Sequence, residues 1–345
     1  MRFTRPRGSE AAGLPVEGGV MQKSSRSRGP ESGAPRRDAL ESRKRRQFLK
    51  SAVVMGVGML AEADGVFARS AAPRTQNMLI GGHAWVYAAP LPGFDYTPVL
   101  EQIFSDFKYA RIDAFELMDT VLLHEDAVEH IGALSHKYST PILGTSFGAD
   151  MWDRSKHQAI MEKAQTVITR LAQLGGRTLG TSVGRAPAPK TPEKLDAQAE
   201  ILRKIMALGQ AHGVVLNLHN HTYEVENGMH DLQGTLERIP DVKLGPDLNW
   251  LVRAGVDPVE FIHRFGKQIV FMHIRDQKPD GTWSEAVGEG NMDYVGIAKA
   301  LHAIPFTGDA VIELAHEKGF QLRRPLREDW KISREFVHRT LGYGA

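Results

Sequence analysis

The chain has 345 residues, of which 42% are hydrophobic and 24% are charged, so it is long enough for one large domain with an apolar core. It has no cysteine, which excludes disulfides, thiolate nucleophiles and cysteine-ligated zinc sites. The net charge of +2 is uneven, because residues 1–68 carry 13 of the 43 basic and 7 of the 41 acidic side chains. The remainder, with 30 basic and 34 acidic residues, has a net charge of −4, which gives no electrostatic reason to expect nucleic acid binding.

The basic N-terminus has the composition of a tail followed by an export signal. Residues 1–40 are rich in Arg, Gly, Ser, Pro and Glu without apolar periodicity, so we expect disorder there. Residues 41–68 combine a basic segment, a short uncharged run and a small-residue cleavage site, as signal peptides do. Within them, residues 45–50 (RRQFLK) resemble the bacterial twin-arginine signal. We therefore expect a periplasmic or secreted protein, and a basic cytosolic tail is the competing interpretation. The uncharged run is too short for a permanent membrane anchor.

Strand-like and helix-like segments alternate from residue 78 to the C-terminus. Apolar runs predict eight strands, at residues 78–80, 111–118, 141–145, 177–183, 214–216, 242–247, 268–273 and 309–313. Helical spacing is found at residues 98–107, 125–138, 153–174, 191–212 and 325–341. Glycines at 175–176 and at 213 end two of these helices.

This alternation over residues 75–345 matches the size and order of a single (β/α)8 TIM barrel, an α/β fold. A doubly wound open sheet is the competing architecture, and it usually has a Gly-rich phosphate loop after its first strand. The sequence contains neither GxGxxG nor GxxxxGK[ST], and residues 81–83 (GGH) match such loops poorly. We therefore predict the barrel, in which the C-terminal ends of the strands surround the active site.

Four of the predicted strands end in side chains that can bind a metal ion. They are His219 after the fifth strand, Asp247 at the end of the sixth, His273 at the end of the seventh and Glu313 at the end of the eighth. Each alone has an ordinary explanation, such as a loop histidine or a helix cap, but four at the same end of one barrel predict a shared divalent cation. Two imidazoles and two carboxylates suit Mn²⁺, Zn²⁺, Fe²⁺ or Co²⁺ better than Ca²⁺, and Mg²⁺ stays open.

Five motifs in the second half of the chain occur in the same order in a known family. They are HNHTYE at residues 219–224, DLNW at 247–250, AGVDP at 254–258, HIRD at 273–276 and VGEG at 287–290. These match HNHDFE, DxYW, AGxDP, HVKD and VGEG of the sugar phosphate isomerase/epimerase family, which has the xylose isomerase-like TIM barrel. The chain resembles that family from about residue 79 to residue 313, in the first half only by its pattern of strands and helices.

The resemblance implies the same four metal ligands, in a site that is less anionic because many relatives have Glu in the place of His219. Three departures from the family motifs are Thr222 in place of Asp, Asn249 in place of Tyr and Arg275 in place of Lys. The last one matters for the substrate, because a planar guanidinium binds carboxylates or paired hydroxyls differently from an ammonium group.

The chemistry implied by the family is removal of the proton next to a sugar carbonyl that the metal polarises. A carboxylate or an imidazole must take that proton and return it. The candidates are the titratable side chains expected in the pocket: Glu116, His221, Glu224 and Glu313. The candidate substrate contacts are the cationic and indole side chains near the strand ends: His83, Trp85, Trp250 and Arg275.

The fate of the proton decides the reaction. Its return gives an isomerase or an epimerase, which we expect, with a divalent metal as cofactor. Loss of a β-substituent would instead make the protein a lyase or dehydratase of a keto-sugar, such as a 3-keto-glycoside or an inosose. A non-catalytic sugar-binding barrel is a further possibility, and the acidic body disfavours a metal-dependent endonuclease. The expected partners are a small sugar or keto-sugar and the twin-arginine export machinery, and a homo-oligomer is compatible with the sequence.

Overall fold

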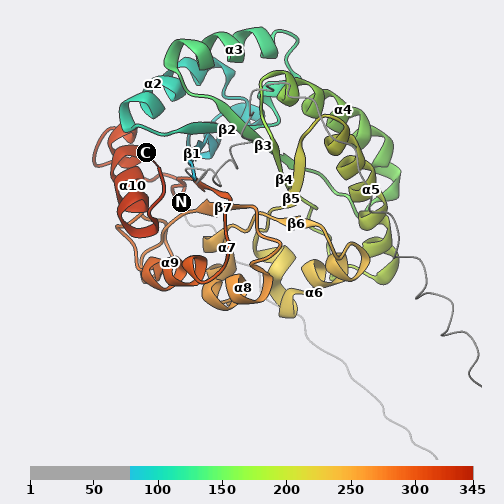
Figure 1. Ribbon diagram of the computed structural model, residues 1–345. Helices are drawn as coiled ribbons and strands as arrows, with labels where there is room; N and C mark the ends of the chain where they lie inside the picture. Colours follow the sequence, from blue (N-terminus) through green and yellow to red (C-terminus); the bar gives the residue numbers. More distant parts are fainter. Residues whose placement is uncertain (1–77, 345) are drawn as a thin grey trace, which may run out of the picture. The chain divides into compact units, whose positions relative to one another are not determined.

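Eight parallel strands form the centre of the computed structural model, which describes residues 78–344 (Figure 1). They are β1 (Ile80–His83), β2 (Ala114–Met118), β3 (Ile142–Gly148), β4 (Thr178–Ser182), β5 (Val215–Leu218), β6 (Lys243–Leu244), β7 (Phe271–Ile274) and β8 (Asp309–Ile312). Their order in the sheet is β6-β5-β4-β3-β2-β1-β8-β7, and bridges from Leu244 to Ile269 and from Asp247 to His273 join the two end strands. The predicted TIM barrel is confirmed. The predicted tail and export signal lie outside the described residues.

Helices surround the strands in Figure 1. They are α1 (Trp85–Ala88), α2 (Leu100–Ala110), α3 (Ala127–Tyr138), α4 (His157–Gln173), α5 (Pro192–Ala211), α6 (Thr222–Arg238), α7 (Leu248–Arg253), α8 (Pro258–Phe265), α9 (Tyr294–His302) and α10 (Leu326–Leu341). Short 3-10 helices lie at Pro92–Phe94, Thr97–Val99, Val121–Leu123 and Arg154–Lys156. In the described part of the chain, no helix has both the length and the apolar character needed to cross a membrane.

Aromatic side chains fill the space between the barrel and the helices that cover it. Phe115 of β2 packs edge to face against Phe104 and Phe107 of α2, with ring centroids 5.1 and 5.0 Å apart. Phe107 also meets Trp330 of α10 at 4.8 Å. Each such ring buries on the order of 150–250 Å². This packing holds α2 and α10 on the outer face of the sheet beside β2 and β1.

The barrel interior changes character from one end to the other. A small apolar cluster fills one layer: Ala114, Leu143, Phe271 and Val311. Side chains two residues apart on a strand point to the same face, so the next interior layer holds the residues two positions later: Glu116, Thr145, His273 and Glu313. That second layer is polar and lies toward the C-terminal ends of the strands. Strand periodicity thus places ionisable groups directly above a dry layer.

The sixth strand is shorter than the sequence predicts. We expected it at residues 242–247, and only Lys243–Leu244 form regular strand. Pro246 has no N–H to donate to a ladder. Gly245 passes so close to the neighbouring strand that a Cβ there would lie 1.9 Å from Asn217 Oδ1. The chain therefore leaves the sheet early, and the last residue of the predicted strand lies in the turn that follows.

Candidate metal centre and active site

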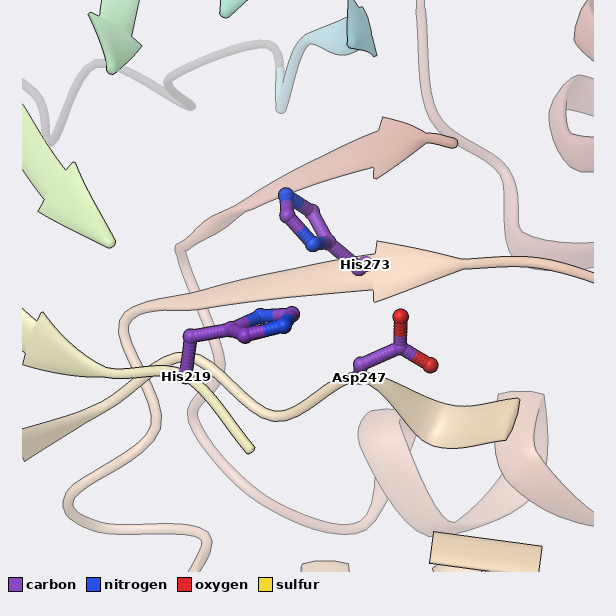
Figure 2. Close-up of side chains that lie close together, drawn as sticks. All are labelled: His219, Asp247 and His273. Atoms are coloured by element: carbon purple, nitrogen blue, oxygen red, sulfur yellow. The ribbon is translucent and has the colours of Figure 1, made fainter. Parts of the chain in front are cut away.

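Three of the four expected metal ligands lie together at the C-terminal ends of the strands. Ligand atoms of His219, Asp247 and His273 all lie within 4.8 Å of one another. Figure 2 shows the three side chains converging from the end of β5, from the turn before α7 and from β7. Ligands that each lie about 2.0–2.2 Å from one ion must be this close to each other. Two imidazoles and one carboxylate also form the donor set of many Fe²⁺ and Zn²⁺ sites.

His219 offers an unused nitrogen to this group. Its Nδ1 atom is buried and has no hydrogen-bond partner among the described residues. Such atoms are rare in folded proteins and indicate an ion or a water at that position. Burial, reinforced by the imidazoles of His273 and His221, holds the pKa of His219 well below its usual value. The ring is therefore neutral, which is the form that binds a metal.

Asp247 uses its two carboxylate oxygens differently. Oδ1 caps α7 by accepting the backbone N–H groups of Asn249 and Trp250, both at 2.9 Å. Oδ2 accepts a hydrogen bond from Nε of Arg275 at 2.8 Å. The backbone of Asp247 is fixed by the side chain of Asn220 through bonds of 3.2 and 3.3 Å. The helix cap and the candidate metal ligand are thus the same residue, with its side chain held in one orientation.

His273 lies between two carboxylates. Its Nε2 is 2.5 Å from Oε2 of Glu116, and its Nδ1 is 2.8 Å from Oε2 of Glu313. Burial disfavours charge on the ring, but the two carboxylates outweigh it and raise the pKa of His273 to about 10. Metal-binding histidines commonly donate their second N–H to a carboxylate, which fixes the ring. Glu116 is fully buried and occupies that position, so we correct the expectation that it is an open base: it is a positioning residue.

Glu313 does not join the three-ligand group, which corrects its expected role as a fourth ligand. Its Oε1 pairs with Nη2 of Arg275 and lies 3.5 Å from Nδ1 of His83. Burial opposes ionisation of Glu313, but Arg275, His83 and His273 together hold its pKa well below the usual value. A carboxylate held ionised by three cationic or imidazole partners is a weak base. Arg275 occupies the place next to Glu313 where an ion would have to lie.

His83 and Trp85 lie at the end of β1. The backbone N–H of Trp85 donates to Nδ1 of His83 at 3.2 Å, and Nε2 of the same ring is 3.2 Å from Oγ of Ser146. Burial lowers the pKa of His83, so it is a neutral imidazole whose Nε2 carries the hydrogen. The indole of Trp85 packs against Phe94 with ring centroids 5.3 Å apart. The structure thus brings His83 against the polar layer and gives Trp85 a packing contact.

His221 stands at the edge of the centre, held by a hydrogen-bond network that centres on Ser182. The Ser182 hydroxyl donates to Oε1 of Glu224 at 2.6 Å, and its oxygen lies 3.2 Å from Nδ1 of His221 and 2.9 Å from the Tyr223 hydroxyl. Because the hydroxyl has one hydrogen, Nδ1 of His221 must donate to it. Nε2 of His221 then carries a lone pair and has no hydrogen bond to a described residue. The side chain of His221 is 36% exposed.

Glu224 has a different role from the one expected. Its Oε2 accepts the backbone N–H of His221 at 2.8 Å, which completes a capping box at the start of α6. Its Oε1 is taken by Ser182, and the whole side chain is buried. Both oxygens are occupied by protein groups. Glu224 therefore positions His221 and is not free to act on a substrate.

An aromatic wall borders the centre on the side of α7. Trp250 lies 5.8 Å from the ring of His221 and meets Trp283 edge to face at 5.7 Å. The guanidinium of Arg253 lies 4.2 Å from the ring centroid of Trp283, and that of Arg275 lies 5.5 Å from the centroid of Trp250. Trp250 and Arg275 were predicted from the sequence. Trp283 and Arg253 were missed, because neither follows a strand and no motif marks them.

Comparisons with known proteins agree with this fold. The family model for the xylose isomerase-like TIM barrel matches residues 108–339. No curated protein matches the chain. A D-allulose 3-epimerase from Methylomonas sp. has a similar structure, with a TM-score of 0.64, 18% identity, and coverage of 77% of this chain and 99% of that one.

Two further solved structures are similar at the same level. A sugar phosphate isomerase/epimerase from Parabacteroides distasonis ATCC 8503 has a TM-score of 0.61 at 16% identity, covering 77% of this chain and 95% of that one. The 3-keto-D-glucoside 4-epimerase from E. coli has a TM-score of 0.60 at 16% identity, covering 76% and 99%. At these identities the likeness establishes the fold. Since the family model covers more than half of the sequence, the chain belongs to the xylose isomerase-like TIM barrel family.

Proposed function

We propose that this protein is a sugar isomerase or epimerase that moves the proton next to the carbonyl of a keto-sugar. The observation that carries the proposal is the group of His219, Asp247 and His273, with the unpartnered Nδ1 of His219, beside the partly exposed imidazole of His221. The three similar structures named above are sugar epimerases or isomerase/epimerases, which supports the proposal.

The three grouped side chains would hold a divalent metal, and their chemistry fits one. Both imidazoles can present a nitrogen, and Asp247 presents an oxygen that Arg275 now contacts. Buried carboxylate and imidazole ligands suit Zn²⁺, Mn²⁺, Fe²⁺ or Co²⁺. When bound, such an ion supplies Lewis-acid polarisation of the substrate carbonyl.

His221 is the residue that we assign to the proton transfer. Its Nε2 lone pair takes the proton from the carbon next to the carbonyl, and the electrons of the broken C–H bond form the double bond of an enediol. Ser182 accepts the hydrogen of Nδ1 and so keeps the ring in the tautomer that can act as a base. Return of the proton to the other face of the same carbon gives the epimer. Return to the former carbonyl carbon gives the isomer.

Arg275, His83 and Trp250 would bind and orient the sugar. The guanidinium of Arg275 brings a buried positive charge to the place where negative charge develops on oxygen. His83 offers an imidazole beside His273, at 5.3 Å between ring centroids. The ring of Trp250 offers a flat apolar face to the C–H groups of a sugar. We do not propose a lyase, because no contact in the described residues favours departure of a β-substituent over proton return.

Hydrogen exchange tests the proposal and separates an enzyme from a sugar-binding barrel. The protein, supplied with Zn²⁺ or Mn²⁺, is incubated in deuterated buffer with D-fructose and D-allulose, and loss of the proton next to the carbonyl is followed by NMR. We expect exchange with the native protein. We expect about 10²–10⁴-fold slower exchange with His221→Asn, because a positioned base contributes about that factor. His263→Asn, at an exposed histidine of α8, serves as the matched control. Absence of exchange from every ketose would reject the enzyme and leave the binding protein.

A further inference from the structure

A second hollow lies beside the candidate active site, between the loop after β4 and the first turns of α6. Residues 185–190 (RAPAPK) line one side. The other side is lined by residues of the first half of α6: Tyr223, Glu226, Asn227, His230 and Asp231. The hollow, called the side groove below, holds about 540 Å³ of space that is open to solvent. Small-molecule sites commonly have volumes of about 300–1,000 Å³.

The side groove reaches the candidate reaction centre through Tyr223. The ring of this tyrosine stacks on His221 with centroids 5.2 Å apart and planes 9° from parallel. Its hydroxyl lies 2.9 Å from Oγ of Ser182, which also contacts the imidazole of His221. A ligand in the side groove would therefore be separated from the proposed base by the thickness of one aromatic ring. A substrate long enough to span that ring would touch both places.

The walls of the side groove are fastened to each other. Lys190 and Asp231 form a buried ion pair with Nζ and Oδ2 2.5 Å apart. Gln198 joins the pair by accepting from Lys190 at 2.7 Å and donating to Asp231 at 2.8 Å. Nε2 of His230 bonds to the backbone carbonyl of Lys190 at 2.9 Å. A buried ion pair with satisfied hydrogen bonds fixes one geometry, so the side groove is a built feature and does not depend on a loose loop.

Backbone strain marks the same place. Asn227, Gly228 and Met229 have φ angles of 54°, 68° and 62°, three left-handed residues in succession. Two of them carry a Cβ, for which this conformation is unfavourable. Such segments persist where the surroundings hold them, and they are frequent at ligand sites. The break turns Asn227 toward solvent at the side groove, where its amide can reach a ligand.

The charges of the side groove indicate a neutral ligand. Two cations, Arg185 and Lys190, face two carboxylates, Glu226 and Asp231. Asp231 neutralises Lys190, so Arg185 is the cation that remains without an ion pair among the described residues. A phosphate would gain that one cation and meet the carboxylate of Glu226. A polyhydroxylated ring can use a guanidinium, a carboxylate, an amide and a tyrosine face at once.

We infer that the side groove binds a second, uncharged sugar ring, so that the substrate is a keto-sugar that carries a glycosyl group. The inference deepens the proposed function, because the ketone-bearing ring would lie at His221 while the attached ring extends past Tyr223. It predicts a preference for keto-disaccharides over free and phosphorylated ketoses.

Binding measurements on the metal-supplied protein test this directly. The probes are D-fructose, D-fructose 6-phosphate and the keto-disaccharides maltulose and lactulose, titrated by calorimetry or by saturation-transfer NMR. We expect a disaccharide to bind at least about tenfold more tightly than fructose, a difference well within what one added ring can contribute. Ala188→Trp places a bulky ring in the side groove from an exposed position. It should bring the affinity ratio of disaccharide to fructose close to one, whereas Ala211→Trp, at the exposed end of α5, should leave the ratio unchanged.

Three results would overturn the inference: fructose 6-phosphate binding most tightly, no disaccharide binding more tightly than fructose, or a ratio that survives Ala188→Trp. Each can occur while fructose still exchanges its proton, in which case the proposed function stands and the side groove does not bind sugar. The reverse is also readable, because disaccharide binding that depends on Ala188, without proton exchange on any probe, would reject the enzyme and keep the groove. Melting temperatures confirm that both tryptophan variants are folded.

Discussion

Arg275 donates a hydrogen bond from Nε to the one oxygen of Asp247 that does not cap a helix, at a distance of 2.8 Å. The other end of the same guanidinium pairs with Glu313. A fixed positive charge thus already lies against the carboxylate that a metal ion would bind. The ion and the guanidinium share Asp247, and the three-ligand centre contains a built-in competitor for its own metal.

Removing this charge should strengthen metal binding. In Arg275→Met we expect the divalent ion to bind about tenfold more tightly, since charges about 4 Å apart near a protein surface interact by up to about 4 kcal/mol. The metal-free variant should melt earlier, because two buried carboxylates lose their partner, a change that costs about 3–5 kcal/mol. Titration calorimetry and melting curves with and without chelator measure both effects. Arg253→Met, which removes a guanidinium from the same aromatic wall, is the control. Weaker metal binding in Arg275→Met would show that the guanidinium supports the site.

Metal binding should release a proton from His273. The pKa of this residue, about 10, keeps the ring doubly protonated at neutral pH in the metal-free protein. Nε2 keeps its hydrogen toward Glu116, so an ion at Nδ1 must displace the other one. Calorimetry at pH 7.5 in buffers of different ionisation enthalpy should report roughly one proton released per ion. Glu116→Gln should release less, since the pKa of His273 falls when one carboxylate is lost.

The same shift fixes the direction of one pH effect on stability. Because the folded pKa of His273 lies above its ordinary value of 6.5, its contribution to the free energy of unfolding is fully present below pH 6.5. It is lost as the pH rises toward 10. Metal affinity changes in the opposite direction and rises over that range. Denaturant unfolding of the metal-free protein between pH 6 and pH 10 checks this, and a stability that grows over that interval would contradict the paired state of His273.

Ser182 should affect turnover without affecting the metal. Ser182→Ala removes the acceptor that holds the Nδ1 hydrogen of His221, at 3.2 Å, together with the donor to Glu224. One such hydrogen bond contributes about 1 kcal/mol, so we expect kcat to fall about fivefold with KM and metal content unchanged. Ser182→Thr, which keeps the hydroxyl, should restore part of the rate. An unchanged kcat in the alanine variant would separate Ser182 from the tautomer of His221.

The twin-arginine signal is a prediction from sequence and can be tested apart from the fold. Replacing the arginine pair at residues 45–46 by lysines should stop export in a bacterium that has the twin-arginine machinery. Cell fractionation followed by immunoblotting reads out the location of the protein. A pair of lysine substitutions at residues 36–37, in the tail before the signal, is the matched control. Export that continues with the lysine pair at 45–46 would reject this route.

Strand periodicity and turn residues were enough to predict the barrel and the end of it where chemistry occurs. His219 and His273 follow apolar β-branched or aromatic runs, and a barrel requires such strand ends to meet. The sixth strand shows the limit of this reasoning. Its pattern runs to Asp247, yet Pro246 and the close approach at Gly245 end the pairing, so the carboxylate becomes a helix cap as well as a candidate ligand.

Partner choice inside the centre could not be predicted. Glu116 and His273 are 157 residues apart, and nothing local to either records that one orients the other. Glu313 and Arg275 are both strand-end residues, and their pairing follows from the reach of a guanidinium that the barrel curvature brings close. Trp283 lies in a loop, where periodicity carries no information.

The most direct test of the centre is the metal content of the purified protein and of four single variants, measured by elemental analysis after loading and desalting. We predict close to one divalent ion per chain in the native protein and in Glu313→Gln, and loss of most of it in His219→Ala, Asp247→Ala and His273→Ala. An ion retained in full by those three alanine variants, or absent from the native protein after loading with each candidate metal, would contradict the proposed centre.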